Sequence, residues 1–186
     1  VLYPFGYGLS YTTFKTKAEI FKNTEDELTV SATVTNTGSV KGKEVVQVYA
    51  KVPQGKLGNP ARKLIGFAKT QELAPGETEE LMIIIPKYDM ASYDDSGVTG
   101  NKSCYVLEAG TYDIFAGSDV RNAESVGTYR EEFRVLEQLQ EAYVPVEKFQ
   151  RMKAVLMPDG TYEAVTEEVP MRTVDPQKRR AEQMPK

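Results

Sequence analysis

Histidine and tryptophan are missing from this sequence of 186 residues, and cysteine occurs once. Without histidine the chain cannot form a Ser-His-Asp or Cys-His catalytic arrangement, and it cannot hold a metal through imidazole. A single cysteine excludes an internal disulfide framework and a cysteine-based zinc site. We therefore expect neither a cofactor nor a metal site.

Long apolar runs and a strong charge of one sign are also lacking. No run approaches the roughly 18 residues that a membrane helix needs, and no charged-then-apolar signal peptide opens the chain. The formal net charge of −4 gives no electrostatic footprint for nucleic acid. We expect neither a membrane nor a nucleic-acid partner. The oligomeric state stays open, and for the compartment we favour the cytoplasm of a bacterium, which the lack of paired cysteines fits.

What the sequence does contain is a series of short segments with the alternation of β-strands. In residues 28–35 apolar side chains alternate with hydroxyl side chains, so that one set lies on a single face. The apolar set is Leu28, Val30, Ala32 and Val34. The turn Asn36-Thr37-Gly38 follows, with residues that tolerate positive φ.

Further strands are predicted at residues 44–52, 63–73, 81–85, 105–117 and 126–135. In residues 44–52 the alternation places Val46, Val48, Ala50 and Val52 inward. Tyr49 lies on the other face, which we expect to be partly covered. The unbroken apolar run 81–85 is typical of a strand covered on both faces. Seven or so short strands between turn signals favour an all-β fold, an antiparallel β-sandwich.

Residues 107–112 have the form of a tyrosine corner, in which the hydroxyl of Tyr112 bonds to the backbone a few residues upstream. The tryptophan and paired cysteines of antibody domains are absent. The immunoglobulin-like sandwich is therefore predicted to be of the fibronectin type III-like kind, held by apolar packing alone.

Several segments, in order, resemble the fibronectin type III-like domain of glycoside hydrolase family 3 enzymes. They are LYPFGYGLSYTTF at residues 2–14, NTG at 36–38, GKEVVQVY at 42–49, KLIGF at 63–67, LAPGE at 73–77 and GTYDI at 110–114. Each string alone is weak, but their order and spacing hold across residues 1–136. The resemblance also implies that residues 1–13 are a linker from a preceding catalytic domain and residues 14–136 are the sandwich.

The same resemblance implies that the chemistry lies outside this chain. Family members resemble β-glucosidases, which retain configuration with two carboxylates about 5–5.5 Å apart. These come from a (β/α)8 barrel and an α/β sandwich domain, and no Asp or Glu here matches either motif. We therefore expect no catalytic residue in this chain, and its partners to be those two domains of one longer polypeptide. The start at Val1, which is not a methionine, fits that expectation.

Residues 137–186 form an extension beyond the usual end of the family's domain. We predict a short helix at residues 137–142, a hairpin at residues 155–162 that turns on Pro-Asp-Gly, and a last helix capped near Asp175-Pro176. The extension suits a connector in a circularly permuted enzyme, with the barrel placed after the sandwich. The alternative is a terminal segment that wraps the hydrolase, and we favour the permuted order slightly.

The aromatic and glycine-rich opening is the first candidate site. Gly6 and Gly8 permit close approach, and large side chains around them supply area to bury. We predict that the following residues dock on another domain: Tyr3, Phe5, Tyr7, Leu9 and Tyr11. The alternative is that they fold onto the core of their own sandwich.

The polar loop at residues 87–103 is the second candidate site. Tyr88 and Tyr93 on this loop are predicted to reach a substrate cleft of the parent enzyme, because long insertions often carry function. Asp89, Asp94 and Asp95 could bind calcium, but their spacing matches no dedicated calcium loop. Solvated loop carboxylates are the favoured interpretation.

Three functions remain open. The first is a non-catalytic accessory domain that stabilises the catalytic domains of a family 3 hydrolase. The second is a carbohydrate-binding module, which would need an exposed aromatic platform. The third is hydrolysis by this chain itself, through two carboxylates that converge from loops. We favour the first.

Overall fold

The computed structural model describes residues 2–139 and 147–168 of the chain. They belong to two compact units, Val1–Leu139 and Gln140–Lys186. The elements of the first unit are β1 (Phe14–Asn23), β2 (Glu27–Asn36), β3 (Val45–Lys51), β4 (Lys63–Lys69), β5 (Thr78–Pro86), the 3-10 helix η1 (Lys87–Met90), β6 (Ser92–Asp94), β7 (Cys104–Leu107), β8 (Gly110–Gly117), β9 (Glu124–Glu131) and β10 (Arg134–Gln138). The second unit contains β11 (Gln150–Leu156) and β12 (Tyr162–Glu168).

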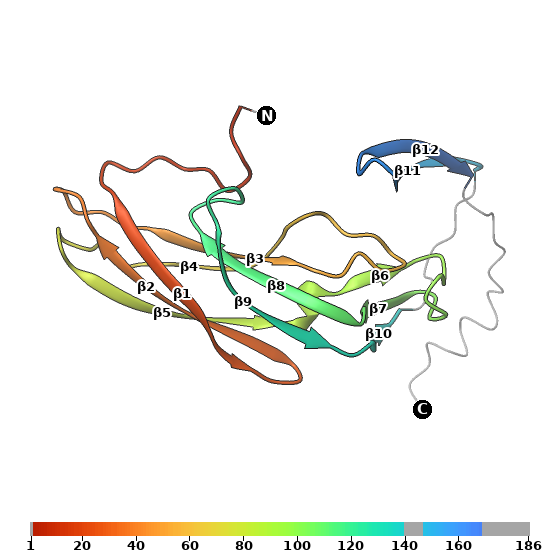
Figure 1. Ribbon diagram of the computed structural model, residues 1–186, viewed down its shortest axis with the longest axis horizontal. Coiled ribbons are helices and arrows are strands. Elements are labelled where there is room, and N and C mark those ends of the chain that lie inside the picture. Colours follow the sequence, from red (N-terminus) through yellow and green to blue (C-terminus); the bar gives the residue numbers. More distant parts are fainter. Residues whose placement is uncertain (1, 140–146, 169–186) are drawn as a thin grey trace. The chain divides into compact units, whose positions relative to one another are not determined.

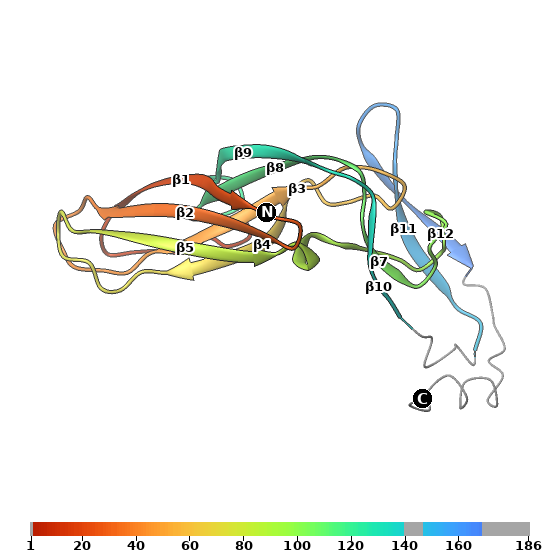
Figure 2. The ribbon, with the colours of Figure 1, turned by 90° about the horizontal axis from the view of Figure 1, so that it is seen from below.

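The first unit is an antiparallel β-sandwich, as predicted. A sheet in the order β1–β2–β5 packs against a sheet in the order β4–β3–β8–β9, and the two layers are visible in Figure 2. A smaller sheet, β10–β7–β6, lies at one end of the unit (Figure 1). The sheets hold antiparallel pairs throughout the described residues.

The core lies between the two large sheets and follows the alternation of the sequence. The predicted inward sets of β2 and β3 are all buried: Leu28, Val30, Ala32, Val34, Val46, Val48, Ala50 and Val52. Ile85, Tyr112 and Ile114 join them from β5 and β8. Each aliphatic side chain buried in this way contributes roughly 1.5–3 kcal/mol relative to an exposed one. Apolar packing therefore holds the sandwich together.

The interpretation of residues 81–85 as a strand covered on both faces is wrong. In β5, Ile83 and Ile85 are buried, but Met82 is 45% exposed and Ile84 is 62% exposed. The strand is at the edge of its sheet and only one of its faces meets the core. Apolar residues in the sequence therefore do not by themselves distinguish a strand covered on both faces from a strand with one exposed face.

Two of the predicted strands are each divided between different sheets. Residues 105–117 form β7 and β8, and residues 126–135 lie mainly in β9 and the start of β10. The first division falls at Glu108, whose buried carboxylate accepts the backbone N–H of Lys56 at 2.7 Å. The chain leaves one sheet there to hold the β3–β4 loop, a contact between distant residues that no local pattern reveals.

The tyrosine corner forms as predicted at this division. The hydroxyl of Tyr112 donates to the carbonyl of Glu108 at 3.0 Å, and Tyr112 is 1% exposed. Its ring stacks on Tyr129 of β9 with centroids 5.3 Å apart. The Nζ of Lys87 lies 4.8 Å from the centroid of Tyr129 and forms an ion pair with Glu131. The corner thus ties β7, β8, β9 and η1 together.

The remaining differences concern the ends of elements. The predicted strand 63–73 ends at Lys69, and Leu73 instead pairs with Gly42 in an isolated bridge. The helix predicted at residues 137–142 is wrong at its start, because Glu137 and Gln138 belong to β10 and Leu139 is not helical. Residues 140–142 lie outside the described ones. Strand β1 was not predicted, although uncharged residues alternate with charged ones from Phe14 to Ile20.

The second unit contains the predicted hairpin. β11 and β12 pair in register from Gln150↔Glu168 to Leu156↔Tyr162. Gly160 adopts φ of 83°, and its N–H donates to the carbonyl of Met157 at 2.9 Å, as a tight turn on Pro-Asp-Gly requires. The helix predicted near Asp175-Pro176 lies outside the described residues.

Candidate functional site

The N-terminal segment, residues 2–13, is fixed to the sandwich through its backbone. The N–H of Val120 donates to the carbonyl of Phe5 at 3.0 Å, and the side-chain amide of Gln47 donates to the carbonyl of Gly6 at 2.9 Å. Gly6 has φ of 81°, and a Cβ there would overlap the side chain of Gln47, so glycine is required. Gly8 has open space around it, so close approach does not explain that glycine.

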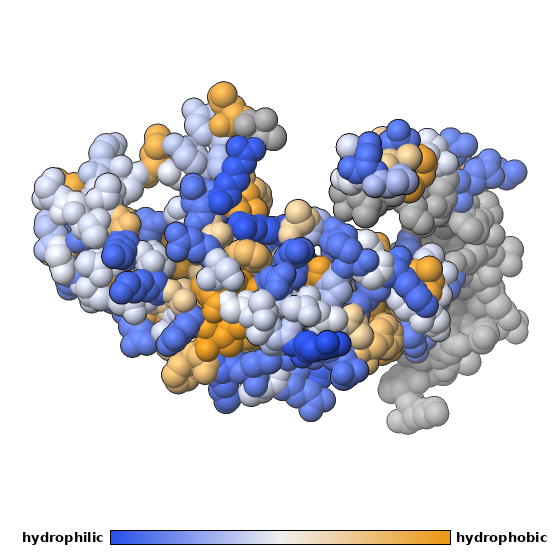
Figure 3. All heavy atoms as spheres, viewed as in Figure 1, coloured by the Kyte–Doolittle hydropathy of each residue, from blue (hydrophilic) through white to orange (hydrophobic). Residues whose placement is uncertain are grey.

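The side chains of this segment point away from the core. The exposed fractions are 61% for Tyr3, 64% for Phe5, 43% for Tyr7, 89% for Leu9 and 101% for Tyr11. None of them enters the sandwich core, contrary to the alternative interpretation. Tyr3 and Tyr7 contact each other, with ring centroids 5.1 Å apart. Figure 3 shows hydrophobic residues on the surface of this projecting segment.

The far end of the segment is held by Asn36, which is completely buried. Its Oδ1 accepts the hydroxyl of Thr12 at 2.9 Å and the N–H of Gly38 at 3.0 Å, and its Nδ2 donates to the carbonyls of Val40 and Leu73, both at 2.8 Å. Gly38 does not adopt the positive φ that its residue type tolerates. A Cβ there would lie 2.8 Å from the backbone nitrogen of Thr13, so close approach requires the glycine.

A second group of side chains, here named the tyrosine surface, consists of three tyrosines and one glutamate, namely Tyr88, Tyr93, Tyr105 and Glu137. The rings of Tyr88 and Tyr93 lie 5.0 and 5.1 Å from that of Tyr105. Tyr88 is 42% exposed and Tyr93 is 40% exposed. The hydroxyl of Tyr88 donates to Glu137 Oε2 at 2.6 Å, and this bond raises the pKa of Tyr88 to about 12.

The structure therefore brings the two predicted tyrosines together and adds two residues that sequence reasoning missed. Tyr105 could have been found, since it opens the strand predicted at residues 105–117. Glu137 could not, because it was assigned to a helix.

In the loop at residues 87–103, the interpretation of solvated carboxylates is wrong for Asp94. Asp94 is completely buried, and its carboxylate accepts the N–H groups of Gly97, Val98 and Thr99 at 2.6, 3.1 and 2.8 Å. Burial acts to raise the pKa of Asp94, but the hydrogen bonds, first that of the Thr99 hydroxyl, bring it below its usual value. Donors surround this carboxylate, so its role is to shape the loop, and it does not act as a cation ligand.

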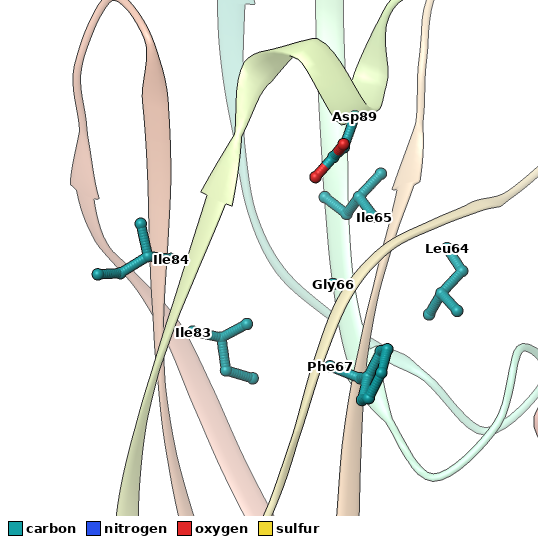
Figure 4. A pocket seen from close by; sticks show the side chains of 7 residues that line it. All are labelled: Leu64, Ile65, Gly66, Phe67, Ile83, Ile84 and Asp89. Atoms are coloured by element: carbon teal, nitrogen blue, oxygen red, sulfur yellow. The ribbon is translucent and has the colours of Figure 1, made fainter.

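An apolar groove of about 430 Å³ lies between the edge strands β4 and β5 (Figure 4). Phe67 is 67% exposed on one side, and Ile84 is exposed on the other. Asp89 from η1 is the only carboxylate among the lining residues. A single carboxylate cannot supply both the nucleophile and the acid/base of glycoside hydrolysis.

A polar hollow of about 380 Å³ lies beside the N-terminal segment and contains two carboxylates, Glu44 and Glu124. Burial raises the pKa of Glu44. Hydroxyl side chains make up much of the remaining lining, namely Ser10, Thr12, Thr13, Thr16 and Ser118. This hollow is where the hypothesis of catalysis by the chain itself can be tested.

Within residues 2–139 and 147–168, no group of three or more His, Cys, Asp or Glu side chains is placed to hold a metal ion. No helix of that part is long and apolar enough to cross a membrane.

The comparisons with known proteins agree with this geometry. Residues 44–120 match the sequence family of the fibronectin type III-like domain. A β-glucosidase of Ruminococcus albus is 46% identical over 187 residues, a match that covers 100% of this chain and 19% of that protein. A β-glucosidase structure from Paenibacillus barengoltzii is 49% identical with a TM-score of 0.85, over 100% of this chain and 21% of that one. A GH3 β-glucosidase from Bifidobacterium adolescentis is 31% identical with a TM-score of 0.63, over 76% of this chain and 20% of its own.

The sandwich is thus a fibronectin type III-like domain. More particularly, the chain is the fibronectin type III-like domain of glycoside hydrolase family 3 proteins, with a C-terminal extension. It spans about a fifth of the length of the relatives that it matches. Two of these matches cover the whole chain, so the extension at residues 137–186 has counterparts in them.

Proposed function

We propose that this chain is a non-catalytic accessory domain that packs against the catalytic domains of a longer family 3 glycoside hydrolase. The observation that carries the proposal is the N-terminal segment. Its backbone is fixed by Gln47 and Val120, while its large apolar side chains stay exposed. Contiguous exposed apolar groups on a fixed support are typical of an interaction site.

From the resemblance we infer the partners and the reaction of the longer protein. The partners are the (β/α)8 barrel and the α/β sandwich domain of the same polypeptide, and residues 1–13 are the linker from one of them. The relatives are named β-glucosidases, and we infer that the longer protein hydrolyses β-glucosides with retention of configuration. The extension at residues 137–186 would be a connector to a following domain, and the coding sequence on both sides of this stretch tests that order.

Docking is tested with Phe5→Ala and a matched control, Phe21→Ala. Both phenylalanines are 64% exposed in this chain, but Phe21 is in β1. In the isolated chain neither change should alter the melting temperature by more than a degree or so. In the longer protein Phe5→Ala should cost roughly 3–5 kcal/mol, because a docked ring becomes buried. Equal, small effects of the two changes in the longer protein would contradict docking.

The absence of catalysis is tested at the polar hollow. We expect no turnover of an aryl β-glucoside by this chain. Turnover that is lost in Glu44→Gln or Glu124→Gln would establish that the chain itself is a hydrolase. Turnover that survives both changes would indicate a contaminating enzyme.

The alternative of a module that targets a polysaccharide surface requires coplanar aromatic rings. In the tyrosine surface the rings are tilted by 44° and 49° relative to Tyr105, so they cannot lie together on a flat crystalline face. We therefore expect no retention of the chain on crystalline cellulose. Retention that is abolished by Tyr93→Ala would favour the targeting module over the accessory domain.

A further inference from the structure

The tyrosine surface combines side chains from four elements on one face of the small sheet. Tyr93 of β6 and Tyr105 of β7 are cross-strand partners, and Tyr105 is also the partner of Glu137 in β10. Tyr88 joins them from η1. The small sheet lies at the end of the first unit away from the N-terminal segment (Figure 1). The surface is therefore separate from the residues proposed to dock.

Ring faces and hydrogen-bonding groups lie together on this surface. The hydroxyls of Tyr93 and Tyr105 make no hydrogen bond to any described residue, and neither is a buried, unsatisfied atom. Glu137 accepts one bond from Tyr88 through Oε2, so Oε1 remains available as an acceptor. Exposed aromatic faces next to free donors and acceptors suit a ligand that is apolar on its ring faces and polar at its edges.

A saccharide has that chemistry. The C–H groups of a pyranose ring carry a weak positive charge and stack on the negative face of an aromatic ring. Its hydroxyls both donate and accept hydrogen bonds, and so pair with tyrosine hydroxyls and with a carboxylate. A protein surface that closed over the rings with apolar side chains would instead leave Glu137 Oε1 and the hydroxyls of Tyr93 and Tyr105 without partners, at a cost in free energy. The observations therefore favour a sugar over a docked domain.

We propose that the tyrosine surface binds a single soluble β-linked gluco-oligosaccharide, with sugar rings stacked on Tyr88 and Tyr93 and hydroxyls bonded to Glu137. The tilt between the rings makes a bent surface, which follows one flexible chain better than a flat crystal face. The choice of β-linked glucose rests on the proposed function of the longer protein. Binding itself does not depend on docking.

The test is a titration of this chain, labelled with 13C in its tyrosine rings, with cellotetraose followed by NMR. We expect shifts confined to the ring signals of Tyr88, Tyr93 and Tyr105 among the 11 tyrosines. Tyr93→Ala should weaken binding at least tenfold, and Tyr88→Ala provides a second variant if the first does not fold. Tyr93→Phe keeps the ring and should lose less. Tyr11→Ala is the matched control, since Tyr11 is fully exposed but lies in the N-terminal segment.

The outcomes separate this proposal from the proposed function. If saturating cellotetraose shifts none of these ring signals, or shifts those of other tyrosines, the proposed site is overturned. Unchanged affinity for cellotetraose in both alanine variants would overturn it as well. If no binding occurs and Tyr93→Ala destabilises only the longer protein, the surface is a domain interface and the proposal is wrong. Specific binding, together with an unchanged stability of the longer protein in Phe5→Ala, would support the site while contradicting docking.

Discussion

Replacing Tyr112 by phenylalanine tests the corner that joins β7 to β8. The change removes a hydroxyl that donates to the carbonyl of Glu108 at 3.0 Å, and it leaves the ring stacked on Tyr129. Because Tyr112 is 1% exposed, water cannot replace the lost donor, and the carbonyl loses a buried partner. The expected loss is about 1–3 kcal/mol.

That loss can be measured by urea unfolding and by thermal melting. For a domain of this size each kcal/mol lowers the melting temperature by roughly 3–5 °C, so a fall of roughly 3–15 °C is expected. Tyr3→Phe is the control, since Tyr3 is 61% exposed and should give no change. Stability of Tyr112→Phe within about 0.5 kcal/mol of the parent chain, which is the scale of exposed substitutions, would refute the reasoning that the corner hydrogen bond stabilises the sandwich.

Three further changes test other contacts. Asp94→Asn turns an amide N–H toward backbone donors and should cost about 2–4 kcal/mol of unfolding free energy. Because the pKa of Asp94 is lowered in the fold, its contribution to stability is present above the ordinary pKa of 3.8 and is lost as the pH falls below it. The unfolding free energy of the variant should therefore depend less on pH in the acid range. Lys87→Met leaves Glu131 nearly buried without its counter-ion and should cost about 3–5 kcal/mol in urea unfolding; a loss below 1 kcal/mol would contradict a structural role for the pair. Gly38→Ala places a methyl group against the backbone of Thr13 and should cost about 1–3 kcal/mol by calorimetry, whereas Gly8→Ala, with open space around it, should be neutral.

The core was predictable because it depends on a local period. Leu28, Val30 and Val34 could be assigned to one face from alternation alone, and the corner at Tyr112 followed from a short motif. The breaks at Glu108 and after Glu131 were not predicted, and each predicted strand is divided there between two sheets. At Glu108 the break coincides with a contact to a loop some fifty residues earlier in the chain.

The candidate site divides in the same way. The aromatic side chains of the N-terminal segment were readable as residues with area to bury, but their anchors at Gln47 and Val120 depend on tertiary contacts. Tyr88 and Tyr93 were singled out from their loop, whereas Tyr105 and Glu137 join them through the pairing of β6, β7 and β10. Asp94 was expected to be solvated. Its burial could not be predicted, because the donors around it come from backbone that has no signature in the sequence.

The anchoring of the N-terminal segment by carbonyl groups has a consequence for how its specificity can change. Every residue carries a carbonyl, so the path at Phe5 does not depend on which side chain is present there, and only Gly6 is fixed by its conformation. Substitutions at residues 3, 5 and 7 can therefore alter the surface that is presented without disturbing the sandwich beneath it. The same scaffold can be re-targeted to a different neighbouring domain by exchanging a few exposed residues, in evolution or by design.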